Sequence, residues 1–178
     1  MKEYIIKTSR LGMRNWEEAD IKPMTAMNMN EQVMEYFPSV QTEQHTKEFI
    51  KRMQNHFDVH GFCYFAVDAL DSKEFIGFIG LCHQNYESDF TPHIDIGWRL
   101  KQSAWGKGYA TEGAKACLEF AFKSLELREV YSVASVINVK SIHVMKKIDM
   151  KKETTFIHPK LLNNNRLKEC VLFRKTLI

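Results

Sequence analysis

Three consecutive features at residues 93–125 constrain the fold of this chain most strongly: a β-rich run, a turn with two glycines, and an amphipathic helix. The run HIDIGWRL is typical of a strand. After the turn WGKGY, apolar residues recur at helical spacing from Ala110 onward, and Glu and Lys residues occupy the opposite face. A buried strand, EVYSVASV, and a helix capped by Asn138 follow. This succession predicts a mixed α/β fold.

The remaining segments are typical of short strands and two earlier helices. Strand-like runs flank Ser9–Arg10, and a short polar connection between FCYFAVDAL and EFIGFIGLCHQ indicates a hairpin. We expect one helix from Glu17 to Met34, with Asp20 as its cap, and another between Thr42 and Gly61. The runs ETTFIH and ECVLFRKTL predict two closing strands.

Composition limits the class of protein. The 178 residues, 44% of them hydrophobic, are enough for one globular domain with a sizeable core. No repeat, low-complexity tract or linker interrupts the sequence, so we expect a single domain over residues 1–178. A net charge of +3 is too small to indicate nucleic acid but is compatible with small anionic ligands.

Cysteine placement and hydropathy indicate the compartment. No CxxC motif or Cys/His cluster has metal-ligand spacing, so we expect no metal site and reduced thiols, as in a cytoplasmic protein. Neither a signal peptide nor an apolar stretch of about 18 residues is evident, so we expect no membrane partner. The scattered cysteines are Cys63, Cys82, Cys117 and Cys170.

The turn before the strong helix is a candidate anion site. Gly106 and Gly108 allow backbone conformations closed to other residues and let a ligand approach the main-chain N–H groups. The first N–H groups of the following helix are unpaired and lie at its positive dipole end, and Lys107 adds a charge. A plain chain reversal is the alternative. The spacing fits neither a dinucleotide fingerprint nor a phosphate loop.

The segment IGWRLKQSAWGKGYATEGA resembles the acyl-CoA-binding segment of the GNAT superfamily of N-acetyltransferases, in which a [RQ]-x-x-G-x-[GA] turn wraps the CoA pyrophosphate. Trp105 replaces Arg or Gln, as in the branch similar to the ribosomal-protein-alanine and -serine N-terminal acetyltransferases. NVKSIHVMKKIDM matches that branch's N-x-x-S-x-x-V-x-x-K-x-G-[FM] helix, with Asp149 where glycine is usual. VMEYFP, FIGFIGL and FTPHIDIGWRL look like a set of uncharacterised bacterial members.

The resemblance implies a twisted mixed sheet of about seven strands flanked by about four helices. Two parallel strands, one ending at Leu100 and the other EVYSVASV, would splay apart in a V and hold acetyl-CoA. Pantetheine would pair with the backbone of the first strand as an added strand would. The implied cofactor-binding residues are Trp98, Arg99, Leu100, Trp105, Gly106, Lys107, Gly108, Tyr109, Ala110, Thr111, Asn138 and Ser141.

Acetyl transfer to an amine needs a base, an oxyanion donor and a proton for the departing thiolate. The resemblance implies a backbone N–H near Leu100 as the oxyanion donor. Asp95 is our candidate base, acting through water; its alternative is a solvated carboxylate or a partner for Arg99. Ser141 is our candidate acid because Met145 stands where many members have a tyrosine; its alternative is a serine that only packs against the cofactor.

We expect the acceptor to be an amine of low pKa. An α-amine with a pKa near 8 is substantially neutral in the cytoplasm, whereas a lysine with a pKa near 10.4 is not. A protein or peptide N-terminus is therefore expected, bound by a monomer or homodimer. A small amine (polyamine, antibiotic or amino-acid derivative) and a catalytically weak CoA-binding module are the alternatives. Candidate substrate-binding residues, for which core packing is the alternative, are Tyr36, Phe37, Phe90 and His93.

Overall fold

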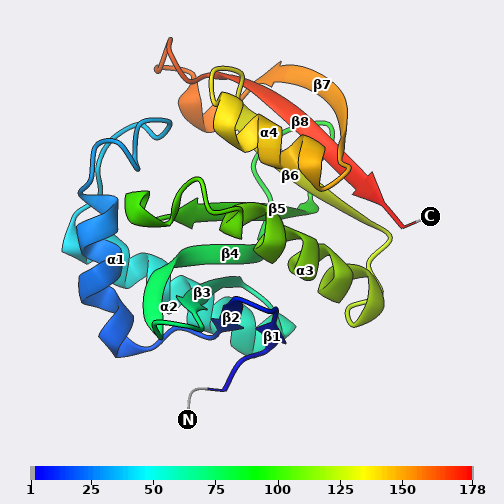
Figure 1. Cartoon of the computed structure of the whole chain (residues 1–178). Coiled ribbons are helices and arrows are strands. Elements are labelled where there is room, and N and C mark those ends of the chain that lie inside the picture. Colours follow the sequence, from blue (N-terminus) through cyan, green and yellow to red (C-terminus); the bar gives the residue numbers. More distant parts are fainter. Residues whose placement is uncertain (1–2, 178) are drawn as a thin grey trace.

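One eight-stranded sheet forms the centre of the computed structural model, which describes residues 3–177. The strand order is β1-β2-β3-β4-β5-β6-β8-β7 (Figure 1). This is one strand more than the predicted seven. The strands are β1 (Ile6–Lys7), β2 (Leu11–Arg14), β3 (Tyr64–Ala69), β4 (Glu74–Gln84), β5 (His93–Leu100), β6 (Glu129–Ser135), β7 (Lys151–Ile157) and β8 (Glu169–Thr176).

The sheet divides between β5 and β6, the one parallel pair of neighbouring strands within the described residues. All other neighbours are antiparallel. Asp95 and Tyr131 are the one register pair that joins β5 to β6 in this part of the chain. Beyond that pair the two strands diverge toward Leu100, which confirms the predicted splay.

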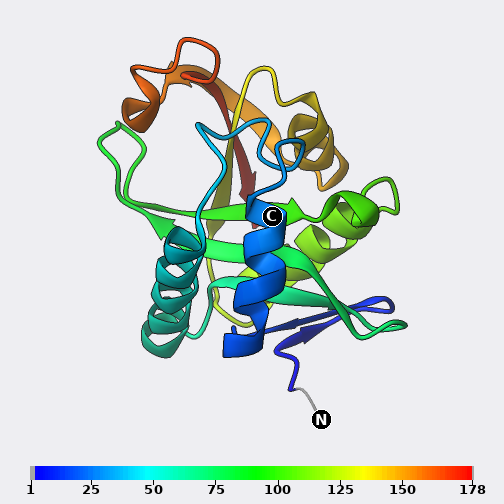
Figure 2. The same ribbon diagram turned by 90° about the vertical axis from the view of Figure 1, so that its left-hand side faces the viewer.

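Four α-helices flank the sheet, as predicted. They are α1 (Ile21–Asn28), α2 (Glu43–His60), α3 (Tyr109–Lys123) and α4 (Val139–Lys147). The first two cover one face of the sheet and α3 covers the other, as Figures 1 and 2 show from two directions. The fourth packs beside β6 and contacts α3. Among the described residues no helix is long and apolar enough to cross a membrane.

Helix ends follow local hydrogen bonding in most places. The Thr42 side chain accepts a bond from the His45 N–H at the start of α2, and Gly61 ends this helix with a φ of 75°. The prediction of a helix as far as Met34 was wrong, since α1 stops at Asn28. The Asn30 Oδ1 accepts from the N–H groups of Gln32 and Val33, so it diverts the chain into turns.

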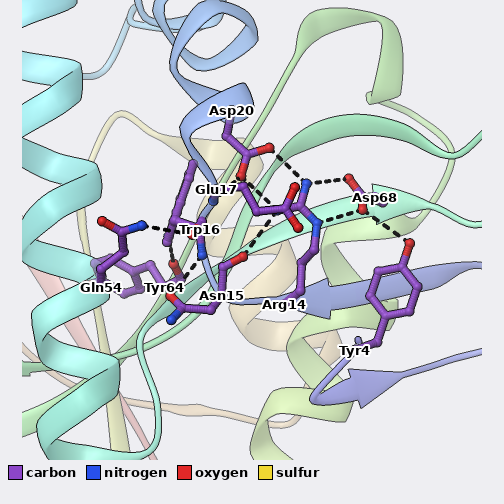
Figure 3. A network of polar contacts seen from close by, with 9 residues as sticks. All are labelled: Tyr4, Arg14, Asn15, Trp16, Glu17, Asp20, Gln54, Tyr64 and Asp68. Carbon is purple, nitrogen blue, oxygen red and sulfur yellow. Dashed lines mark hydrogen bonds and ion pairs between the residues drawn. The ribbon is translucent and has the colours of Figure 1, made fainter. Parts of the chain in front are cut away.

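The Asp20 side chain does not cap α1, contrary to expectation, because it belongs to a buried ionic network. The Arg14 guanidinium, only 2% exposed, donates to both oxygens of Asp20 at 2.7 and 2.8 Å and to both oxygens of Asp68 at 2.8 and 3.0 Å (Figure 3). Burial by itself lowers the Arg14 pKa, but the bonds to the two carboxylates outweigh it and raise the pKa. The network joins β2, the start of α1 and β3.

Candidate active site

A cavity of about 670 Å³ lies where β5 and β6 diverge. Its walls come from the segment between α1 and α2, the end of β5, the start of α3 and the start of α4. The structure brings all the predicted cofactor-binding residues except Lys107 onto this cavity. They are Trp98, Arg99, Leu100, Trp105, Gly106, Gly108, Tyr109, Ala110, Thr111, Asn138 and Ser141.

The glycine turn presents backbone groups to this cavity. Gly106 has a φ of 72° and Gly108 a φ of 80°, in the left-handed region where a side chain is strained. Gly108 is the last residue before α3, and the next N–H groups open the helix without partners inside it. The glycines therefore expose the positive end of α3 to the cavity, as an anion site requires.

An arginine outside the predicted motif braces this turn. The Arg10 Nη1 donates to the Lys107 carbonyl at 2.9 Å, and its Nε donates to Glu112 Oε2 at 2.6 Å. The guanidinium also lies 4.8 Å from the centre of the Tyr109 ring. The Lys107 backbone is thus held from outside, and its side chain does not line the cavity. Sequence reasoning missed Arg10 because it lies 97 positions before Lys107.

The open edge of β5 faces the same cavity. Backbone groups of successive strand residues point to opposite edges. The Lys101 N–H donates to Ile76 at the β4 edge, whereas the Ile96 carbonyl accepts from the Ser132 hydroxyl of β6. The backbone groups of Trp98 and Leu100 therefore point into the splay. The Trp105 indole donates to the Leu100 carbonyl at 2.8 Å. The Leu100 N–H lies on the same edge of the strand as this carbonyl and also points into the splay.

The cavity carries positive charge. Arg99, Lys140 and Lys147 line it, and none of the described residues on its walls is Asp or Glu. The Lys140 Nζ lies 4.5 Å from the centre of the Trp105 ring, next to the glycine turn. This charge distribution suits an anionic ligand such as a phosphate.

Asp95 lies on β5 outside the cavity walls, in a tight polar group. Its Oδ1 accepts from the Tyr64 hydroxyl at 2.5 Å and from the Gln84 amide at 3.2 Å. Burial raises the Asp95 pKa to about 6, although these two bonds act in the opposite direction. A carboxylate with that pKa is well placed to accept protons near neutral pH.

The alternative pairing of Asp95 with Arg99 is wrong. The two residues are about 13 Å apart along the strand, and the Arg99 Nη1 donates to Asn28 Oδ1 at 2.8 Å instead. The guanidinium lies 3.9 Å from the centre of the Phe37 ring. Its Nε has no hydrogen-bond partner within residues 3–177, and burial lowers its pKa to about 10.

Tyr64 is a site residue that the sequence did not reveal. It stands opposite Gly80, which in turn stands opposite Gly97 on β5. A Cβ added at Gly97 would lie 3.1 Å from the Tyr64 ring, so the ring crosses β4 and covers this glycine to reach Asp95. The Trp16 indole donates to the Tyr64 carbonyl at 2.6 Å and holds its backbone (Figure 3). Only the strand register places these residues together.

The predicted substrate residues fall into two groups. Tyr36 and Phe37 line the cavity, whereas Phe90 and His93 do not. Instead, the His93 ring packs 4.9 Å from Tyr131 and 5.8 Å from Phe90, near the start of β5. Burial lowers the pKa of His93, which favours its neutral form. These two residues therefore lie nearer to the Asp95 end of β5 than to Leu100.

Ser141 lies in the first turn of α4. The Ser141 N–H donates to Asn138 Oδ1 at 3.1 Å, so Asn138 caps the helix as predicted. The half-buried Ser141 side chain faces the cavity. Met145 is only 1% exposed and belongs to the core. This position therefore contributes no proton donor to the cavity.

A sheet that is split between two parallel strands, with the exposed start of α3 at the split, is the arrangement that the resemblance to CoA-dependent acyltransferases implies. The acetyltransferase (GNAT) domain family matches residues 10–151. The uncharacterized N-acetyltransferase YnaD of Bacillus subtilis (strain 168) is 32% identical over 153 residues, 85% of each chain. The chain belongs to the GNAT family and is an N-acetyltransferase whose acetyl donor is acetyl-CoA.

Solved structures share this fold. The GNAT-family acetyltransferase from Bacillus anthracis has a TM-score of 0.79 and 27% identity, and the match covers 96% of this chain and 97% of that one. The ribosomal L7/L12 alpha-N-protein acetyltransferase RimL, in complex with coenzyme A, has a TM-score of 0.79 at 15% identity over 98% of each chain. Spermidine N-acetyltransferase from Vibrio cholerae, in complex with CoA and spermine, has a TM-score of 0.75 at 20% identity over 95% of this chain and 96% of that one. The last two similarities concern the fold alone.

Proposed function

We propose that this N-acetyltransferase moves the acetyl group of acetyl-CoA directly to the N-terminal α-amine of a protein or peptide. The observation that carries the proposal is Asp95, a carboxylate with a pKa of about 6 beside the splay. Proton transfer to such a base is unfavourable by only about 2 pKa units from an α-ammonium with a pKa near 8, but by more than about 4 from a lysine with a pKa near 10.4.

The residues on the cavity fit acetyl-CoA, which supplies an activated thioester carbonyl. Gly106 and Gly108 expose the start of α3 for the pyrophosphate, and Lys140 and Lys147 add positive charge. The N–H of Leu100 points into the splay and is our candidate donor to the carbonyl oxygen as negative charge develops there. No carboxylate lines the cavity among the described residues, so nothing there repels the phosphates.

Two side chains handle protons in this proposal. Asp95 receives the proton of the attacking amine through a water molecule, because its carboxylate lies outside the cavity walls. Tyr64 and Gln84 hold the carboxylate in place through Oδ1. The Ser141 hydroxyl, which faces the cavity, passes a proton to the departing thiolate and takes one back from water in the same step. Tyr36 and Phe37 on the cavity, with Phe90 and His93 near Asp95, form the walls for the acceptor.

The charge of the cavity supports an α-amine acceptor over a polyamine. A polycation would meet Arg99, which has no carboxylate partner within residues 3–177 and lies against Phe37. Among the described residues that line the cavity, there is no Asp or Glu to pair with its positive charges. A peptide N-terminus carries a single positive charge at most, and its carbonyl groups can accept from a guanidinium. An antibiotic or amino-acid derivative is the second candidate, since a carboxylate on it would pair with Arg99.

The proposal extends to the protein as a whole. Residues 1–178 form one N-acetyltransferase domain; the common sheet and core of residues 3–177 support this. The protein is cytoplasmic, which its four free, buried cysteines favour. It acts as a monomer or a homodimer.

The test is an acceptor panel assayed by CoA thiol release, with mass spectrometry to locate the acetyl group. The panel contains peptides with free N-termini, the same peptides with blocked N-termini and an internal lysine, spermidine, spermine and amino acids. We expect turnover with the free peptides and loss of turnover after N-terminal blocking. Turnover with spermidine alone would refute the acceptor assignment. Tight acetyl-CoA binding without turnover of any amine would favour the CoA-binding module.

A further inference from the structure

Three histidines gather away from the cavity, where the end of α2 meets β4. His56 and His60 lie one helical turn apart on α2, and His83 lies on β4. One ring nitrogen of each lies within 4.8 Å of the corresponding nitrogens of the other two. The ring centroids are 4.5 Å apart for His56 and His60, 4.4 Å for His60 and His83, and 5.2 Å for His56 and His83. None of the three lines the cavity.

The fold brings the three histidine rings close enough to bind one ion. Positions i and i+4 of a helix share one face, so His56 and His60 point to the same side of α2. β3 begins at Tyr64, which stands opposite Gly80 of β4. The later part of β4, which contains His83, therefore extends beyond the end of β3. The buried Phe62 lies beneath all three rings, with its centroid 5.1 to 5.9 Å from theirs.

The hydrogen bonds of His56 prepare one nitrogen as a ligand. Its Nδ1 lies 2.7 Å from the Phe62 carbonyl, which has no proton to donate, so Nδ1 carries the hydrogen. The lone pair is then on Nε2, directed at His83. A backbone carbonyl that fixes the other ring nitrogen is the usual outer-shell partner of a metal-bound histidine. Burial also lowers the pKa of His56 and His83, which favours the neutral rings that bind metals.

The nitrogen spacing is close to that of a metal site. The His56 Nε2 lies 3.1 Å from the His83 Nδ1. Two nitrogens bound to one tetrahedral zinc ion at about 2.0–2.1 Å lie about 3.3 Å apart. His60 and His83 are exposed, so rotation of their side chains can close the wider separations. The backbone N–H of His83 donates to His56 Nε2 at 3.2 Å. An ion bound to Nε2 would displace this N–H, which would then donate to water.

We propose that His56, His60 and His83 bind one divalent transition-metal ion of the zinc type, with water in the fourth position. Three neutral imidazoles favour zinc, nickel or copper over magnesium or calcium, which prefer oxygen ligands. The ion would join the C-terminal end of α2 to β4 and stabilise this side of the sheet. It takes no part in acetyl transfer, so its binding is independent of the function proposed above.

The test uses the full chain without a histidine tag, treated with EDTA and then freed of the chelator. Calorimetric titration with zinc chloride measures affinity and stoichiometry, and the visible spectrum of bound cobalt(II) reports a tetrahedral site. We compare the wild type with His60→Gln and His83→Gln. His45→Gln is the matched control, because His45 is exposed on the same helix but lies at its other end.

We expect one zinc ion per chain, a raised melting temperature with zinc, and a dissociation constant at least tenfold higher in His60→Gln and His83→Gln. The control variant should bind as the wild type does. Melting temperatures without metal show whether each variant is folded, and either exposed position alone suffices if the other variant is unstable. Wild-type zinc affinity in both variants, or several weakly bound ions per chain, would overturn the proposal.

Discussion

Replacement of Asp95 by Asn should slow acetyl transfer and at the same time stabilise the protein near neutral pH. The Asn side chain keeps an oxygen in the place of Oδ1, so it can still accept from Tyr64 and Gln84. The variant therefore removes the charge and the proton-accepting capacity with little change of shape. A carboxylate kept charged in a half-buried place for catalysis is expected to have opposite effects on activity and on stability.

The stability effect follows from the pKa of Asp95, which rises from its ordinary value of 3.8 to about 6 in the folded protein. Each pKa unit corresponds to about 1.4 kcal/mol. The folded state binds the Asp95 proton more tightly than the unfolded state does. Protonated Asp95 therefore contributes stability that is complete below pH 4 and is lost as the pH rises through 6. For this half-buried group the loss at pH 7.5 is about 1–3 kcal/mol after allowance for screening. The Asn variant avoids this loss.

The activity effect has a defined pH window. With a pKa of about 6, the wild-type carboxylate is roughly nine-tenths ionised at pH 7 and one-tenth ionised at pH 5. Loss of a general base reduces the rate about 100-fold or more. The deficit of the variant should be largest between pH 6 and 8, smaller below because the wild-type base is protonated, and smaller above because an α-amine with a pKa near 8 is already neutral.

The assay is kcat/KM for a peptide acceptor from pH 5 to 9, with thermal melts at pH 4 and pH 7.5. Tyr64→Phe supplies a second check. In the wild type the Tyr64 hydroxyl lowers the Asp95 pKa through its hydrogen bond, so its removal should raise that pKa. The acidic limb of the Tyr64→Phe profile should therefore move to higher pH. A deficit of Asp95→Asn that is the same at every pH would refute the role of Asp95 as a base. A variant that is less stable than the wild type at pH 7.5 would refute the raised pKa of Asp95.

Three further changes test the cofactor site and the adjoining helix. Gly108→Val forces a β-branched residue toward a φ of 80° and so distorts the turn, and the dissociation constant for acetyl-CoA should rise at least tenfold; calorimetry that finds unchanged affinity in a folded variant contradicts the anion site. Ser141→Ala should slow single-turnover acetyl transfer about tenfold to 100-fold with little change in acetyl-CoA affinity, and full activity would leave the thiolate proton to water. Asp149 has a φ of 59°, so Asp149→Gly should raise the unfolding free energy by up to about 1 kcal/mol in urea titrations; a decrease would show that its contact with Lys175 matters more.

The local elements of this protein could be predicted from the sequence because they depend on neighbours within a few positions. The strand His93–Leu100 and the helix that follows Gly108 have their own periodicity. The cap of α4 is a bond between Asn138 and Ser141, three positions apart. The same reasoning failed between Asn28 and Met34, where a side-chain turn at Asn30 ends the helical pattern.

The partners of the functional side chains were decided by the tertiary structure alone. Asp95 and Arg99 lie on one strand, yet each bonds to a residue of another element, Tyr64 at 31 positions and Asn28 at 71 positions away. A shift of one residue in strand register would turn these side chains to the opposite face. The sequence thus determined the α/β order, the glycine turn and the family, because these depend on local spacing. The raised pKa of Asp95, the brace at Arg10 and the three-histidine group required the fold, because burial and long-range contacts create them.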